Sequence, residues 1–266
     1  MRSQIKLFVF DLDGTALGGH VPYDQFPKPF ADFLDDLARR GCRWATNTTW
    51  HPGSQLPVIQ RSRVKSTPAF LSGGTGLFLA AVRRGRLVFD RRHGQAILRL
   101  QRAFHRRHGP QIGRIFRNLL SRNLVESVSY NVDRPQCVLT YACRPSKARA
   151  VLAEVKPLIQ PGIYYDWNPA PRPVNVTLLP CFMNKRDIVG VMQKRLGLTA
   201  EQTLVAGDGI NDLAMMNRAA ARWAVCPDNA DARIKQAVRA MGGVVARRRY
   251  SWGVMEGVLR ILDGLT

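Results

Sequence analysis

Two aspartates with one residue between them, Asp11 and Asp13, have the spacing to do chemistry together. They end an apolar, strand-forming stretch, and because side chains in a strand alternate between its two faces, both carboxylates face the same side. Gly14 then permits a sharp turn. Two like charges this close together are costly unless a cation or a proton is shared between them. The pair therefore predicts an acid–base or cation-binding centre rather than an ordinary turn.

A second acidic segment, GDGIND at residues 207–212, adds Asp208 and Asp212. It follows another apolar stretch that reads as a strand, so both carboxylates are expected at a strand's carboxyl end, where open parallel sheets bind their ligands. Four carboxylates without Cys or His partners form an oxygen site that suits Mg²⁺ better than zinc. The sequence therefore predicts a magnesium site built from these four aspartates.

The elements that must position these residues alternate between strands and helices over most of the chain. Such alternation predicts an α/β fold with a doubly wound, Rossmann-like parallel sheet. The expected strands are at residues 4–10, 42–45, 69–71, 203–206 and 223–225, and the expected helices are at 27–40, 57–63, 185–196, 232–240, after 211 and after 253.

The middle of the chain has a different pattern, with more strands and a long helical stretch. The expected strands are at 87–89, 125–130, 136–142, 163–167 and 174–179, and the helices cover 93–120, as one or two helices, and 146–159. This content is typical of an α+β insert. We therefore expect a core domain made of residues 1–82 and 179–266 and an inserted cap domain made of residues 83–178.

Four segments, in order along the chain, resemble the motifs of the haloacid dehalogenase-like hydrolase superfamily. They are DLDGT at residues 11–15, Thr46, Lys185 at a helix start, and GDGIND. The position and mixed content of the insert, between the second and third motifs, are similar to the large α/β caps of the Cof-type sugar-phosphate phosphatase branch. The resemblance covers the chain outside the insert.

The resemblance implies a role for each motif residue. Asp11 would attack phosphorus to form an aspartyl-phosphate, and Asp13 would protonate the leaving alcohol and then deprotonate the hydrolytic water. Thr46 and Lys185 would hold the transferring phosphoryl oxygens. The Mg²⁺ cofactor would be bound by Asp11, the main-chain carbonyl of Asp13, and Asp208, with Asp212 in support.

Substrate and phosphate binding are expected at Asn47, Gly73, Gly74 and Asn211. At two of these positions the chain differs from the pattern of the Cof-type branch. It usually has Thr-Gly-Arg where this chain has Thr46, Asn47 and Thr48, so a substrate-binding arginine is missing. It usually has Asn-Gly where this chain has the two glycines. These departures bear on the identity of the substrate more than on the chemistry.

The charge of the chain is strongly basic, with 40 Lys and Arg against 19 Asp and Glu and a formal net charge of +21. A charge of this size suggests an anionic partner, but +13 of it lies in residues 83–178. There, Ile97, Leu100 and Phe104 form one helical stripe and Gln95, Arg99, Arg102 and Arg106 the opposite one. A solvated arginine face is the favoured interpretation. Arginines that close over a phosphorylated substrate, and a site for RNA, DNA or another polyanion, remain alternatives.

Cysteine usage and hydropathy exclude two classes of protein. The five cysteines are odd in number and include no CxxC pair, which disfavours a disulfide framework and a zinc site. No apolar run approaches the roughly 18 residues of a membrane span, so we expect a cytoplasmic protein with no membrane partner.

The sequence as a whole predicts a Mg²⁺-dependent phosphatase that hydrolyses a small phosphorylated metabolite, with a sugar phosphate as the favoured class. One alternative is a phosphotransferase or phosphomutase that uses the same aspartyl-phosphate. Another is a polyanion- or nucleic-acid-binding protein with a vestigial phosphatase site. The oligomeric state is not determined by the sequence.

Overall fold

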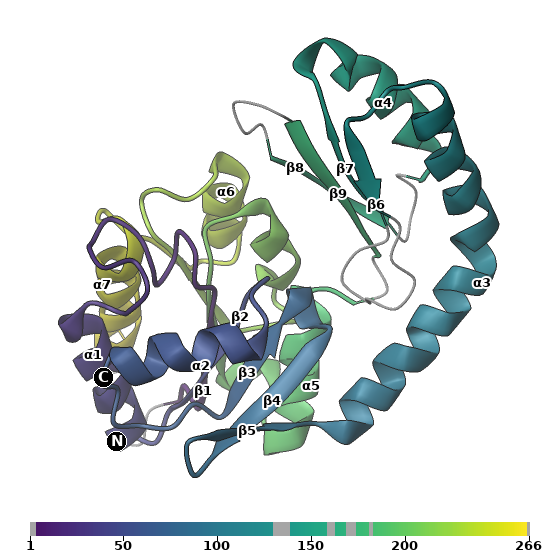
Figure 1. Cartoon of the computed structure of the whole chain (residues 1–266). Helices are drawn as coiled ribbons and strands as arrows, with labels where there is room; N and C mark the ends of the chain where they lie inside the picture. The colour runs from purple at the N-terminus through teal and green to yellow at the C-terminus, as the bar shows by residue number, and fades with distance from the viewer. Residues whose placement is uncertain (1–3, 130–138, 159–162, 169–173, 181–182, 265–266) are drawn as a thin grey trace. The chain divides into compact units, whose positions relative to one another are not determined.

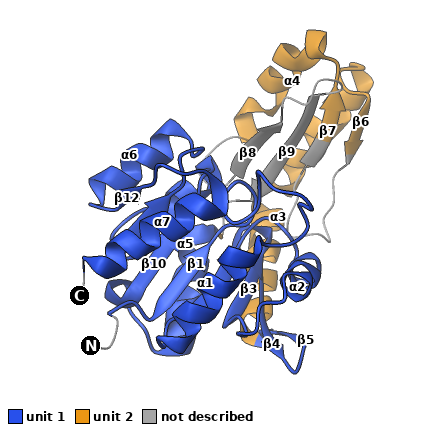
Figure 2. Cartoon of the chain, turned by 90° about the vertical axis from the view of Figure 1, so that its left-hand side faces the viewer, with its two compact units in different colours: residues 1–91, 184–266 blue, residues 92–183 orange. Residues whose placement is uncertain are grey.

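The structure is a computed structural model that describes residues 4–129, 139–158, 163–168, 174–180 and 183–264. It divides into two compact units (Figure 2). We call Met1–Arg91 with Asn184–Thr266 the core unit and Arg92–Met183 the insert unit.

The core unit is built on an eight-stranded sheet with the strand order β12-β11-β10-β1-β2-β3-β4-β5. Figure 1 labels its strands β1 to β5. The strands from β12 to β3 are parallel, and β4 and β5 are antiparallel at one edge. This mostly parallel sheet confirms the predicted α/β fold. The strands are β1 (Leu7–Phe10), β2 (Arg43–Asn47), β3 (Phe70–Gly73), β4 (Phe78–Arg83), β5 (Arg86–Phe89), β10 (Thr203–Ala206), β11 (Trp223–Cys226) and β12 (Val244–Val245).

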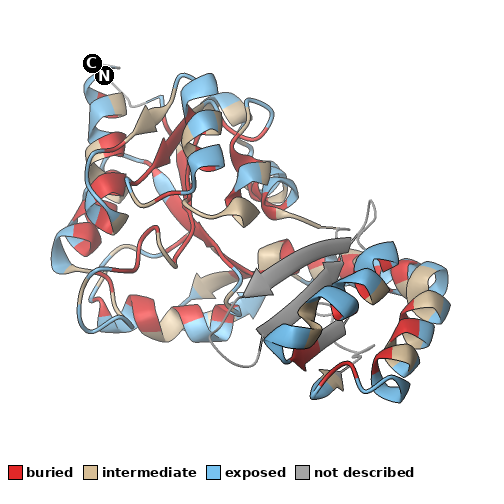
Figure 3. Cartoon of the chain, turned by 90° about the horizontal axis from the view of Figure 1, so that it is seen from above, coloured by how far each residue is buried: buried red, intermediate tan, exposed pale blue. Residues whose placement is uncertain are grey.

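Helices cover both faces of this sheet, because alternate side chains of each buried strand pack on opposite sides. On β1, Phe8 and Phe10 pack into the hydrophobic cluster that includes α1, α2 and α7, whereas Leu7 and Val9 pack into the cluster of α5 and α6. The central strands are accordingly buried (Figure 3). The helices are α1 (Lys28–Arg39), α2 (Pro52–Arg61), α5 (Lys185–Leu196), α6 (Ala232–Ala240) and α7 (Tyr250–Asp263).

Several elements of the core unit differ from the sequence-based expectation. Helix α2 begins at Pro52 rather than at residue 57, because the His51 side chain caps it and a proline is well suited to a helix's first turn. The expected helix after residue 211 is instead a 3₁₀ segment, Ile210–Met215. Strand β4 was not predicted. The first predicted domain division, after residue 82, falls inside the β4–β5 hairpin, which pairs with β3.

The insert unit contains a four-stranded antiparallel sheet with the order β6-β7-β9-β8. Side chains of its helices pack with Tyr141 and Cys143 of β7 in a separate hydrophobic cluster. The elements are α3 (Arg91–Ser121), β6 (Ser127–Ser129), β7 (Leu139–Cys143), α4 (Ala148–Val155), β8 (Ile163–Asn168) and β9 (Val174–Pro180).

Helix α3 is one continuous helix that runs through Pro110. Its buried stripe includes Ile97, Gln101 and Phe104, while Leu100, which the sequence placed in the apolar stripe, is 39% exposed. Ile97, Gln101 and Phe104 are separated by four and then three residues, in keeping with the 3.6-residue period of an α-helix. Leu100 lies toward the edge of the stripe that these residues form. All eight arginines of α3 are exposed: Arg91, Arg92, Arg99, Arg102, Arg106, Arg107, Arg114 and Arg117.

Within the part of the chain that the structure describes, no helix combines the length and the apolar character needed to cross a bilayer. Three of the five cysteines, Cys42, Cys143 and Cys226, are buried and free. The other two, Cys137 and Cys181, lie in stretches outside the described residues.

Candidate active site

The two acidic segments meet because their strands are neighbours in the sheet. Strand β1 pairs in parallel with β10, and Phe10 lies beside Ala206. The chain continues this alignment for one residue, since the Asp11 amide donates to the carbonyl of Ala206 over 3.0 Å. Asp11 and the segment 207–212 therefore lie side by side at the carboxyl ends of the two central strands.

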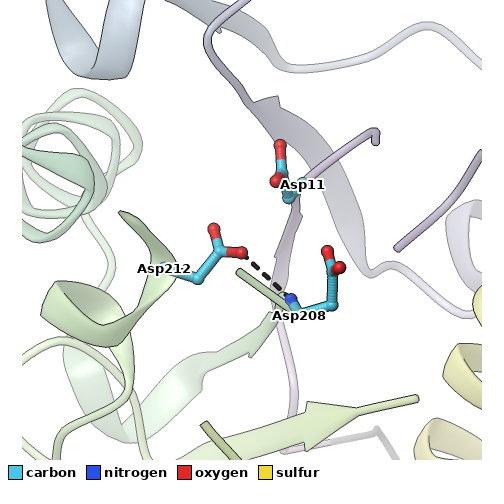
Figure 4. Close-up of side chains that lie close together, drawn as sticks. All are labelled: Asp11, Asp208 and Asp212. Carbon is cyan, nitrogen blue, oxygen red and sulfur yellow. Dashed lines mark hydrogen bonds between the residues drawn. The ribbon is translucent and has the colours of Figure 1, made fainter. Parts of the chain in front are cut away.

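Three carboxylates form a compact cluster there (Figure 4). One oxygen from each of Asp11, Asp208 and Asp212 lies within 4.8 Å of the others. Asp212 Oδ2 accepts hydrogen bonds from the amides of Asp208 and Gly209, both at 3.0 Å. The carboxylate of Asp212 is thus held by two backbone amides, and that of Asp11 by the amide of Leu12.

Two glycines make room for these carboxylates. A Cβ at Gly14, whose φ is +71°, would lie 2.0 Å from Asp208 Oδ2. A Cβ at Gly207 would lie 2.4 Å from Asp212 Cγ. Any side chain at either place would occupy the space of a carboxylate, which explains why glycine is required in both acidic segments.

Lys185 is the cation of this cluster, and its side chain is fully buried. Its Nζ lies 3.0 Å from Asp11 Oδ2 and donates to Asp212 Oδ1 over 2.5 Å. It is the first residue of α5, where Asn184 caps the helix with a reciprocal capping box, and its carbonyl accepts from Asn47 Nδ2 over 2.9 Å. Both ends of the lysine are therefore fixed.

Burial shifts the ionisation of every member of this group. It raises the pKa of the Asp11 carboxyl above its ordinary value, Asp212 adds to this shift, and Lys185 opposes it. Burial also raises the pKa of Asp212, and that of Asp208 to about 6. For Lys185 burial alone lowers the pKa, but the carboxylates of Asp11 and Asp212 more than offset it and raise the pKa. Carboxyl groups that resist ionisation in this way gain from an added cation.

The donor set fits a magnesium ion. All three clustered residues offer carboxylate oxygens, which Mg²⁺ prefers, and the group contains no sulfur or imidazole ligand. Lys185 supplies one positive charge for three acidic groups, so a divalent cation would balance the remainder. The residues that could hold such an ion are Asp11, Asp208 and Asp212.

Asp13 does not share the contacts of this cluster through its carboxylate. Its Oδ1 accepts from the Tyr23 hydroxyl over 2.5 Å, and its Oδ2 accepts from the Trp50 indole Nε1 over 2.6 Å. Asp13 thus has two neutral donors, whereas Asp11 is paired with a lysine. The two aspartates of the first motif therefore occupy different chemical environments.

A comparison with protein families bears on what these residues do. The model described as haloacid dehalogenase-like hydrolase matches residues 130–246, a segment that includes Lys185, Asp208 and Asp212. Residues 130–246 thus have the sequence of a haloacid dehalogenase-like hydrolase.

Solved structures share the fold of this hydrolase. They include a sucrose-phosphatase from Synechocystis in complex with sucrose and phosphate, 18% identical, with a TM-score of 0.65 over 99% of each chain. A haloacid dehalogenase-like hydrolase from Bacillus subtilis is 16% identical, with a TM-score of 0.62 over 99% of this chain and 93% of that one. A phosphatase of the same superfamily from Bacteroides thetaiotaomicron is 15% identical, with a TM-score of 0.60 over 97% of this chain and 95% of that one. No curated protein matches the sequence.

The second motif of this hydrolase has an unexpected arrangement. The Thr46 hydroxyl is buried and donates to Gln55 Oε1 over 2.5 Å, so its described partner is another side chain of the core unit. Asn47 is also buried, and its amide holds the Lys185 carbonyl. The structure thus brings Asn47 to Lys185 and connects Thr46 to Gln55 of α2 instead.

The remaining predicted positions lie at the end of β3 and in two 3₁₀ segments. Gly73 has the Trp50 carbonyl 2.3 Å from where its Cβ would be, so only glycine fits there. Gly74 has a φ of +60°, and its amide donates to the Thr49 carbonyl. Asn211 lies in the 3₁₀ segment next to Asp212. No described hydrogen bond connects these three residues to the carboxylate cluster.

Sequence reasoning missed four residues that contact the site of this hydrolase. The Thr15 hydroxyl donates to Asp208 Oδ1 over 2.7 Å, and its place in DLDGT was an available signal. Trp50 lies just after the second motif, within the ATNTTW segment. Tyr23 and Gln55 lie outside the recognised motifs, and nothing in their local sequence connects them to the site.

Proposed function

We propose that this hydrolase is a Mg²⁺-dependent phosphatase that acts on a small phosphorylated metabolite through an aspartyl-phosphate at Asp11. The observation that carries the proposal is the arrangement of Asp11: a buried carboxylate, paired with Lys185, beside the two further carboxylates of Asp208 and Asp212. A carboxylate placed among cations can act as a nucleophile toward phosphorus.

In the proposed reaction an oxygen of Asp11 bonds to phosphorus as the bond from phosphorus to the leaving oxygen breaks. Asp13 gives a proton to the leaving alcohol and later takes one from the water that hydrolyses the intermediate. Lys185 neutralises negative charge next to the nucleophile. Bound by Asp11, Asp208 and Asp212, Mg²⁺ would supply further Lewis-acid neutralisation of the phosphoryl oxygens.

The substrate class is proposed to be a sugar phosphate. Support comes from the fold shared with a sucrose-phosphatase and from the Cof-type pattern of the motifs. The missing arginine after Thr46 and the paired glycines Gly73 and Gly74 in place of Asn-Gly indicate that this chain recognises its leaving group with other residues.

Turnover of p-nitrophenyl phosphate by the full chain tests the proposal. We expect hydrolysis that requires Mg²⁺, stops with EDTA and returns when Mg²⁺ is restored. Asp11→Asn should lower kcat by at least about 10³-fold, because an amide cannot form the aspartyl-phosphate.

Asp32→Asn is the matched control, since Asp32 is exposed and paired with Lys28 on the surface of α1. It should leave kcat within about 2-fold of the wild-type value. Hydrolysis that persists at the wild-type rate in Asp11→Asn, or in excess EDTA, would contradict the proposed function.

A further inference from the structure

Two aromatic side chains hold the carboxylate of Asp13, one on each oxygen. We propose that Tyr23 and Trp50 are positioning residues that orient Asp13 for proton transfer to the leaving group. This inference rests on the proposed function, because Asp13 has an acid–base role only in that reaction.

Tyr23 lies just before two contacts that fasten its loop to the C-terminal end of α2. The next residue, Asp24, pairs through Oδ2 with Arg61 Nε at 3.0 Å. Farther along, the amide of Phe26 donates to Ser62 Oγ over 2.6 Å. Tyr23 is 46% exposed, so it contacts Asp13 without being packed into the core.

Trp50 is placed by a buried network from the second motif. Gln55, which is fully buried, donates from Nε2 to the carbonyls of Trp50 and Ser72 over 2.7 and 2.9 Å. These two acceptors fix its amide orientation, so Oε1 is left to accept from the Thr46 hydroxyl. Gly73 leaves room for the Trp50 carbonyl. The predicted phosphate-site residues Thr46 and Gly73 therefore support the tryptophan that contacts Asp13.

Trp50 and Tyr23, the two donors to the Asp13 carboxyl group, differ in their hydrogen-bonding chemistry. An indole N–H can only donate, so Trp50 favours a form of Asp13 in which Oδ2 stays an acceptor. A tyrosine hydroxyl can donate or accept, so Tyr23 can stay bonded to Oδ1 whether or not that oxygen carries a proton. The two contacts together fix the orientation of the Asp13 carboxyl group from both of its oxygens.

The first step of the proposed reaction moves one proton from Asp13. As the bond from Asp11 to phosphorus forms and the bond from phosphorus to the leaving oxygen breaks, the proton of the Asp13 carboxyl group passes to the leaving oxygen. Asp13 becomes a carboxylate, and both of its oxygens then accept hydrogen bonds, from Tyr23 and Trp50. Charge-assisted hydrogen bonds of this kind stabilise the ionised product form.

A leaving-group series with the full chain and Mg²⁺ tests the inference. The substrates are p-nitrophenyl phosphate, phenyl phosphate and glycerol phosphate, and the readout is kcat/KM, which reports the steps up to loss of the leaving group. Nitrophenolate leaves without a proton, whereas glycerol needs one. We expect Tyr23→Phe and Trp50→Phe to lower kcat/KM for glycerol phosphate by about 10- to 100-fold, and for p-nitrophenyl phosphate by less than about 3-fold.

Retained turnover of p-nitrophenyl phosphate in the same variants shows that they are folded. Trp252→Phe is the matched tryptophan control, since Trp252 is 42% exposed on α7, and it should leave the whole series unchanged. Equal losses on all three esters, or no loss on glycerol phosphate, would overturn the positioning role of the residue changed. If the wild-type protein hydrolyses none of the esters, the proposed function fails as well.

Discussion

The carboxylate cluster of the core unit and the arginine face of α3 use charge in opposite ways. The cluster is a small set of buried groups, and each carboxylate has a backbone amide, a hydroxyl or Lys185 as a partner. The eight arginines of α3 are exposed, and none has a described ion pair among the residues that the structure covers. The helix contains no acidic residue at all.

This difference shows why the net charge of +21 is a poor guide to function. Buried charges interact strongly and are costly to separate, so their positions are specified by hydrogen bonds. Exposed charges are screened by water and salt, and each contributes little to stability. The activity is therefore expected to depend on a few acidic residues and one lysine. The large excess of exposed basic residues is expected to contribute little to stability.

Removing the buried lysine should have the largest effect on stability. Lys185→Met leaves Asp11 and Asp212 without their shared cation, so the free energy of unfolding in EDTA should fall by about 3–5 kcal/mol. Lys28→Met removes a lysine that is 83% exposed and pairs with Asp32, and should cost less than about 0.5 kcal/mol. Urea denaturation of both variants measures the contrast. Equal costs would show that burial does not separate the two kinds of charge.

Metal binding should stabilise the core unit by a smaller amount, and only through the cluster. At a Mg²⁺ concentration about 100 times its Kd, binding adds about 2.7 kcal/mol and should raise the melting temperature by about 5–10 °C. Asp208→Asn should remove most of this shift, because it deletes one of the three clustered carboxylates. Differential scanning fluorimetry with and without Mg²⁺ measures it, with Asp32→Asn as the control. A full shift in Asp208→Asn would place the ion elsewhere.

Neutralising part of the arginine face should have the smallest effect. The triple variant Arg99→Gln, Arg102→Gln and Arg106→Gln should change the free energy of unfolding by less than about 1 kcal/mol and kcat/KM by less than about 2-fold. Urea denaturation and the glycerol phosphate assay check both values. A loss of kcat/KM above about 10-fold would mean that these arginines contact the substrate, and the comparison between the two regions would then fail.

The sequence predicts an element well where local chemistry defines both of its ends. Helix α5 was expected at residues 185–196 and is found at Lys185–Leu196. Asn184 caps its start, and Gly197, with a φ of +66°, ends it in the left-handed conformation. The carboxylate cluster was predictable for a similar reason, since its residues lie directly after two short apolar strands.

The sequence fails where a contact depends on chain segments that only the fold brings together. Tyr23 and Trp50 converge on Asp13 from two different loops, and no spacing rule connects them. Thr46 has the residue type and place of a phosphate ligand, yet its hydroxyl contacts Gln55, nine residues later in the chain. Strand β4 is recognisable mainly through its antiparallel partners β3 and β5.

The position of β1 in the sheet has a consequence for how the chain folds during synthesis. One neighbour of β1 is β2, but the other is β10, which the ribosome makes roughly 200 residues later, or about 10–40 s at ordinary elongation rates. Until then one edge of the apolar strand LFVF lacks its native partner. Such an edge can pair with other chains, so the nascent protein is open to incorrect strand pairing until β10 has been made.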